Sequence, residues 1–215
     1  MDAIFEIVTK LQKVLDSGGC ASGLFLDFRK AFDSIPISQL IRKLKSVRIG
    51  VTCFSWFVSN LTNRSHRVSV ANTLSYSSEL KTGVPQGSVL GPILFLICIN
   101  DISFLKLHGQ LALFADDTNL FYEGNSQADL LKQMAHDFPL ILSWLEKNGM
   151  SLNPRKTVYN IFSNKNVLSS SQVLSVSGHH IQRKDSVTYL GISLDSHFRW
   201  SSQVQAIAQK IYPPF

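Results

Sequence analysis

The chain has 215 residues, of which 45% are hydrophobic and 17% are charged. These proportions are typical of a globular protein and exclude an intrinsically disordered chain. The 21 basic and 15 acidic side chains give a net charge of +6, which permits a polyanionic partner but does not require one. The three cysteines are widely separated and lack the spacing of a zinc site or of a disulfide framework.

The N-terminal segment and the apolar stretches bear on localisation. The segment MDAIFEIVTK carries acidic residues where a signal peptide would need basic and apolar ones. The longest apolar stretch, Val89 to Ile99, is far shorter than the roughly 20 residues that span a bilayer. We therefore expect an intracellular protein that is not secreted and has no membrane partner, without distinguishing nucleus from cytoplasm.

The first half of the chain predicts mainly helices. In chain order, the expected elements are a helix at 3–15, a short buried strand at 23–27, helices at 37–47 and 54–63, a hairpin of segments 67–71 and 79–82, and an apolar helix that begins at Pro92. The segment GVPQGSVLG before that helix is rich in Gly and Pro. Such a loop can offer backbone N–H groups to a ligand, or it can simply connect a strand to a helix.

The second half predicts strands around one long helix. The expected elements are a hairpin centred on Asp116 and Asp117, a helix from Ser126 to Gly149 that Pro139 kinks or splits, a strand, turn and strand over 150–162, a polar loop at 163–171, a hairpin of segments 173–176 and 181–183, a strand at 187–194, and a last helix from Ser201. No internal repeat or linker is evident.

Three carboxylates form the candidate chemical site. Asp116 and Asp117 lie side by side between two apolar runs, and Asp27 ends the predicted strand at 23–27. The pair alone is also typical of a hairpin tip without any ligand. With Asp27 added, the set supplies the oxygen ligands of hard divalent cations, two of which can support an in-line phosphoryl displacement. Side chains alternate along a strand, so only a turn at this point lets Asp116 and Asp117 both approach the ions.

Five segments, in order, resemble the palm motifs of reverse transcriptases. Their sequences are most similar to those of non-LTR (LINE-type) retrotransposons of the jockey and chicken-repeat kind. They are LFLDFRKAFDSIP, GVPQGSVLGPILFLICINDI, FADDTNLF, LNPRKT and YLGISLD. The resemblance covers about Asp2 to Ile211. It implies an α+β fold, the palm of a right-hand polymerase, with an antiparallel sheet and helices packed on one face. Residues 1–215 would form one palm domain, with partial fingers elements at about 37–82, palm-end strands at about 173–195, and no thumb.

The resemblance also implies roles for particular residues. By that similarity, Asp27, Asp116 and Asp117 bind the metal and catalyse, and Lys156 protonates the leaving pyrophosphate. The nucleotide-binding residues would be Phe28, Arg29, Lys30, Ala31, Phe32, Gln86 and Gly87, and the primer grip would include Tyr189, Leu190 and Gly191. The implied cofactor is Mg²⁺, as two ions, with Mn²⁺ as the substitute. The implied partners are an RNA template, a DNA primer and dNTPs, while the oligomeric state is not predicted.

Two of these roles have plain structural alternatives. Phe32 matches the aromatic ring that rejects a ribose 2′-hydroxyl, but a Phe in this position also suits simple core packing. Lys156 is equally compatible with a solvated lysine. Phe114 precedes Ala-Asp-Asp, whereas viral RNA-templated RNA polymerases commonly have Gly-Asp-Asp, and together with Phe32 this favours DNA synthesis on RNA.

The sequence departs from the family pattern in ways that leave a second hypothesis open. Gln203 stands three residues after Trp200, where the family usually has His. The chain also starts 26 residues before Asp27, so we expect a fragment without the full fingers, thumb or endonuclease. The main hypothesis is an RNA-directed DNA polymerase. The alternative is an inactive retroelement remnant that binds nucleic acid or protein, and a metal-dependent nuclease is the third.

Overall fold

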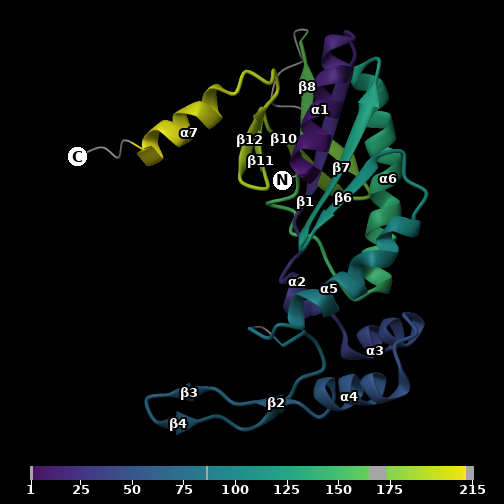
Figure 1. Cartoon of the computed structure of the whole chain (residues 1–215), viewed down its shortest axis with the longest axis vertical. Helices are drawn as coiled ribbons and strands as arrows, with labels where there is room; N and C mark the ends of the chain where they lie inside the picture. Colours follow the sequence, from purple (N-terminus) through teal and green to yellow (C-terminus); the bar gives the residue numbers. More distant parts are fainter. Residues whose placement is uncertain (1, 86, 165–172, 212–215) are drawn as a thin grey trace. The chain divides into compact units, whose positions relative to one another are not determined.

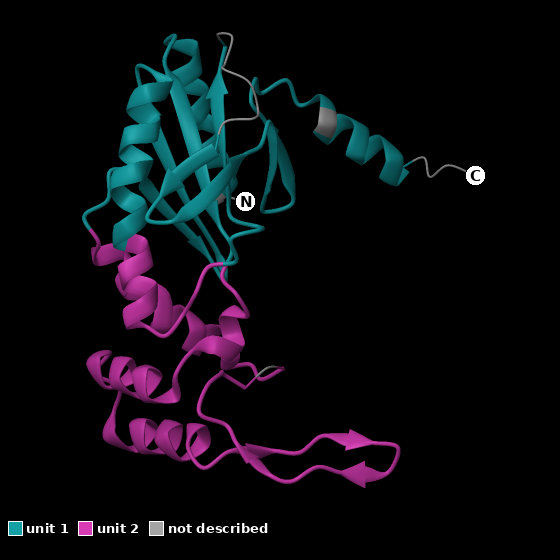
Figure 2. Ribbon diagram, turned by 180° about the vertical axis from the view of Figure 1, so that it is seen from behind, with its two compact units in different colours: residues 1–27, 106–140, 153–215 teal, residues 28–105, 141–152 magenta. Residues whose placement is uncertain are grey.

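The computed structural model describes residues 2–85, 87–164 and 173–211. The chain divides into two compact units (Figure 2). Unit 1 comprises Met1–Asp27, Lys106–Leu140 and Asn153–Phe215, and unit 2 comprises Phe28–Leu105 and Ile141–Leu152. Gln86 and most of the predicted polar loop at 163–171 lie outside the described residues. Within the described ranges, no helix combines the length and the apolar character needed to cross a membrane.

A six-stranded sheet forms the centre of unit 1 (Figure 1). Its strands, in spatial order, are β6 (Gln110–Phe114), β7 (Asp117–Gly124), β1 (Cys20–Leu26), β8 (Val158–Ser163), β10 (His179–Arg183) and β9 (Val173–Val176). Neighbouring strands are antiparallel except for β8 and β10, which are parallel. A separate hairpin joins β11 (Ser186–Tyr189) to β12 (Ile192–Asp195), and the helices are α1 (Asp2–Asp16), α6 (Gln127–Lys147) and α7 (Ser201–Ile211).

Both faces of this sheet are covered, because side chains alternate along each strand. On one face, Ala21 and Phe25 of β1 belong to a buried cluster with Ile7, Leu11 and Leu15 of α1. On the other face, the Ser22 hydroxyl contacts the Met134 sulfur of α6 at 3.4 Å. Strand β1 is therefore buried along its whole length, which holds its C-terminal end firmly.

Unit 2 consists mainly of helices and a long hairpin arm. Its elements are α2 (Ala31–Ser34), α3 (Ile37–Ser46), α4 (Val51–Leu61), α5 (Gly91–Ile99), the 3-10 helix η1 (Asn100–Phe104), and four two-residue strands, β2 (Ser65–His66), β3 (Ser69–Val70), β4 (Thr73–Leu74) and β5 (Ser78–Glu79). Strand β2 pairs with β5 and β3 pairs with β4, so a hairpin forms near the predicted turn, but its second arm runs over 73–79 and not over the predicted 79–82. Its turn lies at Ala71 and Asn72, both with positive φ.

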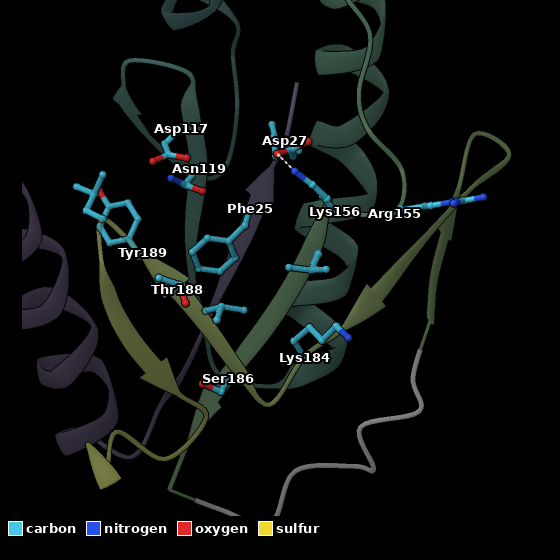
Figure 3. A pocket seen from close by; sticks show the side chains of 14 residues that line it. Phe25, Asp27, Asp117, Asn119, Arg155, Lys156, Lys184, Ser186, Thr188 and Tyr189 are labelled. Carbon is cyan, nitrogen blue, oxygen red and sulfur yellow. Dashed lines mark ion pairs between the residues drawn. The ribbon is translucent and has the colours of Figure 1, made fainter. Parts of the chain in front are cut away.

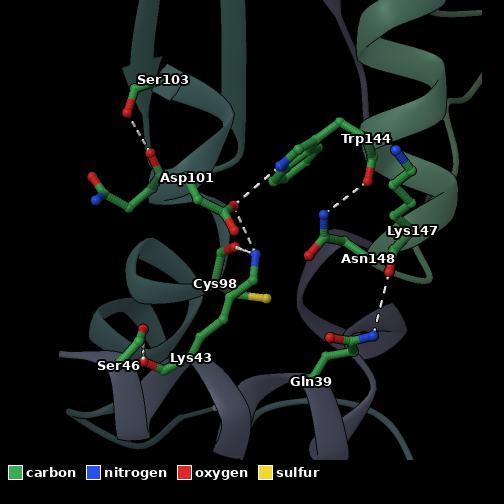
Figure 4. Close-up of polar contacts among 10 residues, drawn as sticks. Gln39, Lys43, Ser46, Cys98, Asp101, Ser103, Trp144, Lys147 and Asn148 are labelled. Atoms are coloured by element: carbon green, nitrogen blue, oxygen red, sulfur yellow. Dashed lines mark hydrogen bonds and ion pairs between the residues drawn. The ribbon is translucent and has the colours of Figure 1, made fainter. Parts of the chain in front are cut away.

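A buried lysine connects the helices of unit 2 (Figure 4). The Lys43 ammonium on α3 is 2.8 Å from an Asp101 carboxylate oxygen and donates to the Cys98 carbonyl oxygen. The Trp144 indole N–H donates to the same Asp101 oxygen at 3.1 Å, and the ammonium lies 5.1 Å from the Trp144 ring centroid. Because a buried charge without partners is costly, these contacts stabilise the packing of α3, α5, η1 and the C-terminal part of α6 against one another.

We predict that Lys43→Ala lowers the free energy of unfolding by about 1–3 kcal/mol, because it leaves the Cys98 carbonyl without its ammonium donor and the Asp101 carboxylate without its cationic partner. The measurement is urea unfolding followed by circular dichroism. Lys45→Ala, at an exposed position of the same helix, is the matched control and should change stability by less than about 0.5 kcal/mol. Equal stability of the two variants would contradict the stabilising role of the network.

The α+β fold class is confirmed, and several details differ from the sequence predictions. The sheet contains one parallel pair, and helices α1 and α6 cover opposite faces where a single covered face was expected. Pro139 does not split α6, which is assigned as one helix over Gln127–Lys147. A proline removes only one backbone hydrogen bond of a helix, and the buried side chains of Met134, Phe138 and Ile141 continue the apolar face past it.

Two predicted strands are also different in the structure. The segment 187–194, expected as one strand, is the hairpin of β11 and β12, because Leu190 and Gly191 both have positive φ and form its turn. The segment 150–152 forms no strand, and only Leu152 makes an isolated bridge to Phe28. The helix after the Gly/Pro-rich loop begins at Gly91, one residue before the predicted start.

Candidate active site

The two adjacent carboxylates lie at a tight turn between β6 and β7. Phe114 pairs with Asp117 in the antiparallel register, so Ala115 and Asp116 alone form the turn. Ala115 has a φ of 52°, in the left-handed region that costs a non-glycine residue about 1–2 kcal/mol. The predicted turn is confirmed. Asp116 lies in the turn itself and Asp117 is the first residue of β7, and both are exposed.

Asp27 lies next to this turn through the pairing of β1 with β7. The last pair of that register is Leu26 with Thr118. One residue further along, Asp27 follows the end of β1 and Asp117 begins β7, so the two carboxylates occupy opposing positions of antiparallel strands. Side chains at such positions have Cβ atoms about 4.5–5.5 Å apart. The pairing therefore brings together residues 90 positions apart in sequence.

The electrostatics of the site reflect this crowding of negative charge. The pKa of Asp117 is raised above its ordinary value, first by partial burial and then by repulsion from the carboxylates of Asp116 and Asp27. Like charges that face one another disfavour ionisation, whereas a bound cation reverses the effect. The carboxylates of Asp27 and Asp116 are thus both close enough to Asp117 to act on it.

The loop at 153–157 holds Asp27 in place on both sides of its backbone. The Asn153 N–H donates to the Asp27 carbonyl oxygen at 2.8 Å, and the Asp27 N–H donates to the Thr157 hydroxyl at 3.3 Å. Thr157 is buried, which fixes the hydroxyl. The same loop presents Lys156, whose ammonium lies 4.0 Å from an Asp27 carboxylate oxygen. The segment LNPRKT therefore positions one carboxylate and places an exposed cation beside it.

Asp27, Asp117 and Lys156 all face one cavity of about 590 Å³ in unit 1 (Figure 3). Its wall is formed by the ends of β1 and β7, the loop with Arg155 and Lys156, and strand β11 with Lys184 before it. The other polar lining residues are Asn119, Lys184, Ser186 and Thr188. Asp116 is not among the lining residues. The cavity thus combines carboxylates at one end with cationic side chains along its wall, a suitable arrangement for metal ions and phosphate groups.

The residues predicted as a primer grip lie at the edge of this cavity. Tyr189 and Leu190 line it, and Leu190 and Gly191 form the β11–β12 turn. The Tyr189 ring is buried against Phe25 and Phe121, with ring centroids 6.5 Å and 5.4 Å away. Burial raises the pKa of Tyr189, and the nearby Asp117 carboxylate raises it further. Tyr189 is therefore a packing residue whose hydroxyl stays protonated close to the site.

The residues predicted to bind the nucleotide belong to unit 2. Phe28 and Ala31 are buried, whereas Arg29 and Lys30 are exposed. The Phe32 ring stacks on Phe95 with centroids 4.5 Å apart, and it lines a second cavity of about 490 Å³ together with Gly87. Gln86 lies outside the described residues. Phe32 is half-buried. One part of its ring packs in the interior, and another part is exposed to solvent.

Several cavity residues were absent from the sequence predictions. Asn119 follows Asp117 by two positions on β7, so strand alternation could have placed it on the same side. Arg155 precedes Lys156 in the same loop. Lys184 and Thr188 reach the cavity because β10 lies beside β8, and nothing in the sequence reveals that order of strands.

In this sheet, the β6–β7 hairpin carries two carboxylates at its turn and lies beside the end of β1, where Asp27 follows. This arrangement defines the palm of a right-hand nucleic-acid polymerase. The family model described as reverse transcriptase (RNA-dependent DNA polymerase) matches residues 2–194. The chain belongs to this family.

Known relatives agree with the retrotransposon resemblance. The chain is 24% identical over 219 residues to a protein named as the probable RNA-directed DNA polymerase from transposon BS of Drosophila melanogaster, an alignment that covers 99% of this chain and 24% of that protein. It is 26% identical over 215 residues to the RNA-directed DNA polymerase from the mobile element jockey of the same species, covering 97% of this chain and 23% of the relative. The chain thus spans about a quarter of the length of these relatives.

Solved structures of low sequence identity share the fold. A telomerase from Candida tropicalis, solved with a fragment of telomeric RNA, superposes with a TM-score of 0.63 at 13% identity, covering 94% of this chain and 33% of the telomerase. An apo telomerase of the same species, truncated from the C-terminal domain, gives a TM-score of 0.61 at 16% identity, covering 91% and 38%.

Proposed function

We propose that this chain carries the polymerase chemistry of a retrotransposon reverse transcriptase: the addition of dNTPs to the 3′-hydroxyl of a DNA primer on an RNA template. One observation carries the proposal, namely that Asp27 and Asp117 reach the same cavity from opposing strands, with Asp116 in the adjoining turn. Family membership supports it. The full activity, template and partners of the element are proposals, because the relatives are about four times as long.

The carboxylates suit divalent cations. Asp27, Asp116 and Asp117 supply only oxygen atoms, and the pKa of Asp117 is raised first by its partial burial and then by the neighbouring carboxylates, an effect that a bound cation would reverse. Oxygen ligands of this kind are those of Mg²⁺, with Mn²⁺ as a substitute. When bound, two such ions would supply charge stabilisation to the attacking and leaving oxygens of the phosphoryl transfer. The role of the chain is to hold the three carboxylates in one place.

Other residues of the cavity would bind and orient the substrates. Lys156 would donate a proton to the leaving pyrophosphate, a role supported by its exposed ammonium beside Asp27. Arg155 and Lys184 would attract phosphate groups along the cavity wall. Tyr189, Leu190 and Gly191 would contact the primer at the edge of the cavity. We propose further that residues of about 173–195 serve as the palm-end strands and those of about 37–82 as fingers elements.

The second unit would contribute to nucleotide recognition. We expect Phe28 to Ala31 to lie along the triphosphate, and Gln86 and Gly87 to contact the nucleotide and template. The exposed side chains of Arg29 and Lys30 support a phosphate-binding role. Phe32 would act as the gate that excludes a ribose 2′-hydroxyl, which its half-buried ring beside a cavity supports.

We predict that Phe32→Val raises the incorporation of ribonucleotides relative to deoxyribonucleotides by at least about tenfold, because steric exclusion of one small group is worth about 1–3 kcal/mol. The measurement is single-nucleotide extension with dNTP and rNTP in parallel. Phe95→Leu, which removes the stacking partner of Phe32, is the control and should lower stability without changing the selectivity. If both variants only lose stability, Phe32 is a packing residue.

The activity itself is tested with the 215-residue chain, an RNA template with an annealed DNA primer, dNTPs and Mg²⁺. We expect primer extension that stops on addition of EDTA and is lost in Asp116→Asn, while RNA binding measured by fluorescence anisotropy is unchanged. Salt-sensitive RNA binding without extension would contradict the proposal and favour a binding remnant. Cleavage of unprimed RNA that depends on Asp116 would instead identify a nuclease.

A further inference from the structure

A second polar cluster of unit 1 lies between α6 and the start of β6. The Asp137 side chain of α6 is fully buried, and both of its oxygens accept hydrogen bonds from the loop before β6. The backbone N–H groups of His108 and Gly109 each donate to Asp137 Oδ2 at 2.9 Å. These bonds fix the carboxylate. Its Oδ1, which also accepts from the His108 backbone N–H at 3.1 Å, faces the two imidazoles.

The two imidazoles converge on that single oxygen. The Nδ1 atom of His108 lies 3.1 Å from Asp137 Oδ1, and the Nδ1 atom of His136 lies 3.0 Å from the same oxygen. The two rings are nearly perpendicular, with centroids 4.4 Å apart. About half of each histidine side chain is exposed, at 52% for His108 and 54% for His136. The cluster is therefore anchored at its buried carboxylate and open to solvent at its imidazoles.

We propose that His108, His136 and Asp137 bind a divalent transition-metal ion, with Zn²⁺ as the best match. Two imidazole nitrogens and one carboxylate oxygen form a typical zinc ligand set, and a water molecule can complete the tetrahedron from the exposed side. Ligands of a tetrahedral zinc at bond lengths of about 2.0–2.1 Å lie about 3.3 Å apart. The nitrogen-to-oxygen distances of 3.0 and 3.1 Å approach this separation.

The metal-free cluster is held ready for this ion. In its absence, the imidazole Nδ1–H groups donate hydrogen bonds to Asp137, so the three side chains are already together. For binding, each neutral imidazole changes tautomer: its Nδ1 proton is exchanged through solvent for a proton on the exposed Nε2, which frees the Nδ1 lone pair for the ion. Imidazole is a poor ligand for Mg²⁺, whereas it suits Zn²⁺, Cu²⁺ and Ni²⁺. The chain thus has two chemically distinct metal sites, since the candidate active site offers only carboxylate oxygens.

The position of the cluster means that a bound ion would link two elements of unit 1. His108 and Gly109 directly precede β6, the strand that leads to the Ala115–Asp116 turn, while His136 and Asp137 belong to α6. A metal ion would join the entry of β6 to the helix that covers the sheet. Because only the folded chain brings these residues together across 27 intervening positions, binding should stabilise the fold.

The test is calorimetric titration of the 215-residue chain with Zn²⁺ in the presence of excess Mg²⁺, supported by the visible absorption of Co²⁺ in the same site. We expect one equivalent of Zn²⁺, a rise in the thermal unfolding midpoint with Zn²⁺, and at least a tenfold loss of affinity in His108→Gln and in His136→Gln. His180→Gln, at an exposed histidine outside the cluster, is the matched control and should bind like the wild type. Asp27→Asn should also retain the site.

Two outcomes would overturn the proposal. One is the absence of saturable Zn²⁺ binding by the folded wild-type chain. The other is unchanged stoichiometry and affinity in the double variant His108→Gln/His136→Gln, with folding verified by circular dichroism. Both outcomes are independent of polymerase activity, so the proposed function and the proposed zinc site are tested separately.

Discussion

Replacing Asp27 by Asn is expected to lower the rate of single-nucleotide addition at least about a thousandfold, because a catalytic metal contributes several kcal/mol and each 1.36 kcal/mol is a factor of ten. Asn preserves the size of the side chain and both backbone hydrogen bonds of residue 27 to the 153–157 loop. The loss would therefore report the missing charge. The measurement is a single-turnover assay at saturating dNTP on a primed RNA template.

The control for Asp27 is Asp16→Asn, an exposed carboxylate at the end of α1 in the same unit. Its rate should match that of the wild type within about twofold, since surface substitutions away from a site change little. Retention of more than a tenth of the wild-type rate in Asp27→Asn, with the fold intact, would remove Asp27 from the metal site.

The second large effect is expected at Lys156. If its ammonium donates a proton to the leaving pyrophosphate, Lys156→Met should slow nucleotide addition by about 10²–10⁴-fold. Lys156→Arg separates proton donation from charge, because arginine keeps the positive charge but is not deprotonated in proteins. A proton-donor role predicts that the arginine variant is nearly as slow as the methionine variant.

Rapid-quench measurement of the rate across pH completes this test of Lys156. Lys132→Met, at an exposed position of α6, is the matched control for the loss of one positive charge. If Lys156→Arg retains most of the wild-type rate, the side chain acts as a charge that holds phosphate. If Lys156→Met also retains it, Lys156 is a solvated lysine without a catalytic role.

The parts of the site that the sequence predicts are those set by local chemistry. Apolar runs that flank two acids predict a hairpin, and the structure has its turn at Ala115 and Asp116. A buried apolar strand ending in Asp27 predicts an anchored carboxylate, and β1 is buried on both faces. The pairing of β1 with β7 brings these residues together. This long-range pairing is implied by the order of the family motifs, whereas the periodicity of the sequence alone does not reveal it.

The missed features depend on tertiary structure or on atypical turn residues. The β11–β12 turn uses Leu190 and Gly191, although such turns usually begin with Asn or Asp, so the segment resembled one continuous strand. Helix α6 continues through Pro139 because packing on the sheet outweighs one lost hydrogen bond. The cluster of His108, His136 and Asp137 has no motif spacing, and it exists only because the entry of β6 lies against α6.

The most direct test of the central claim, that these carboxylates hold the catalytic ions, is metal rescue of Asp117→Cys. A thiolate binds soft ions and is a poor ligand for Mg²⁺. We predict that the variant adds nucleotides at less than about one hundredth of the wild-type rate with Mg²⁺ and recovers at least tenfold with added Cd²⁺, while the wild-type chain, which has its own three cysteines, shows no such gain. A variant as active as the wild type with Mg²⁺ would contradict the claim that Asp117 binds the catalytic metal.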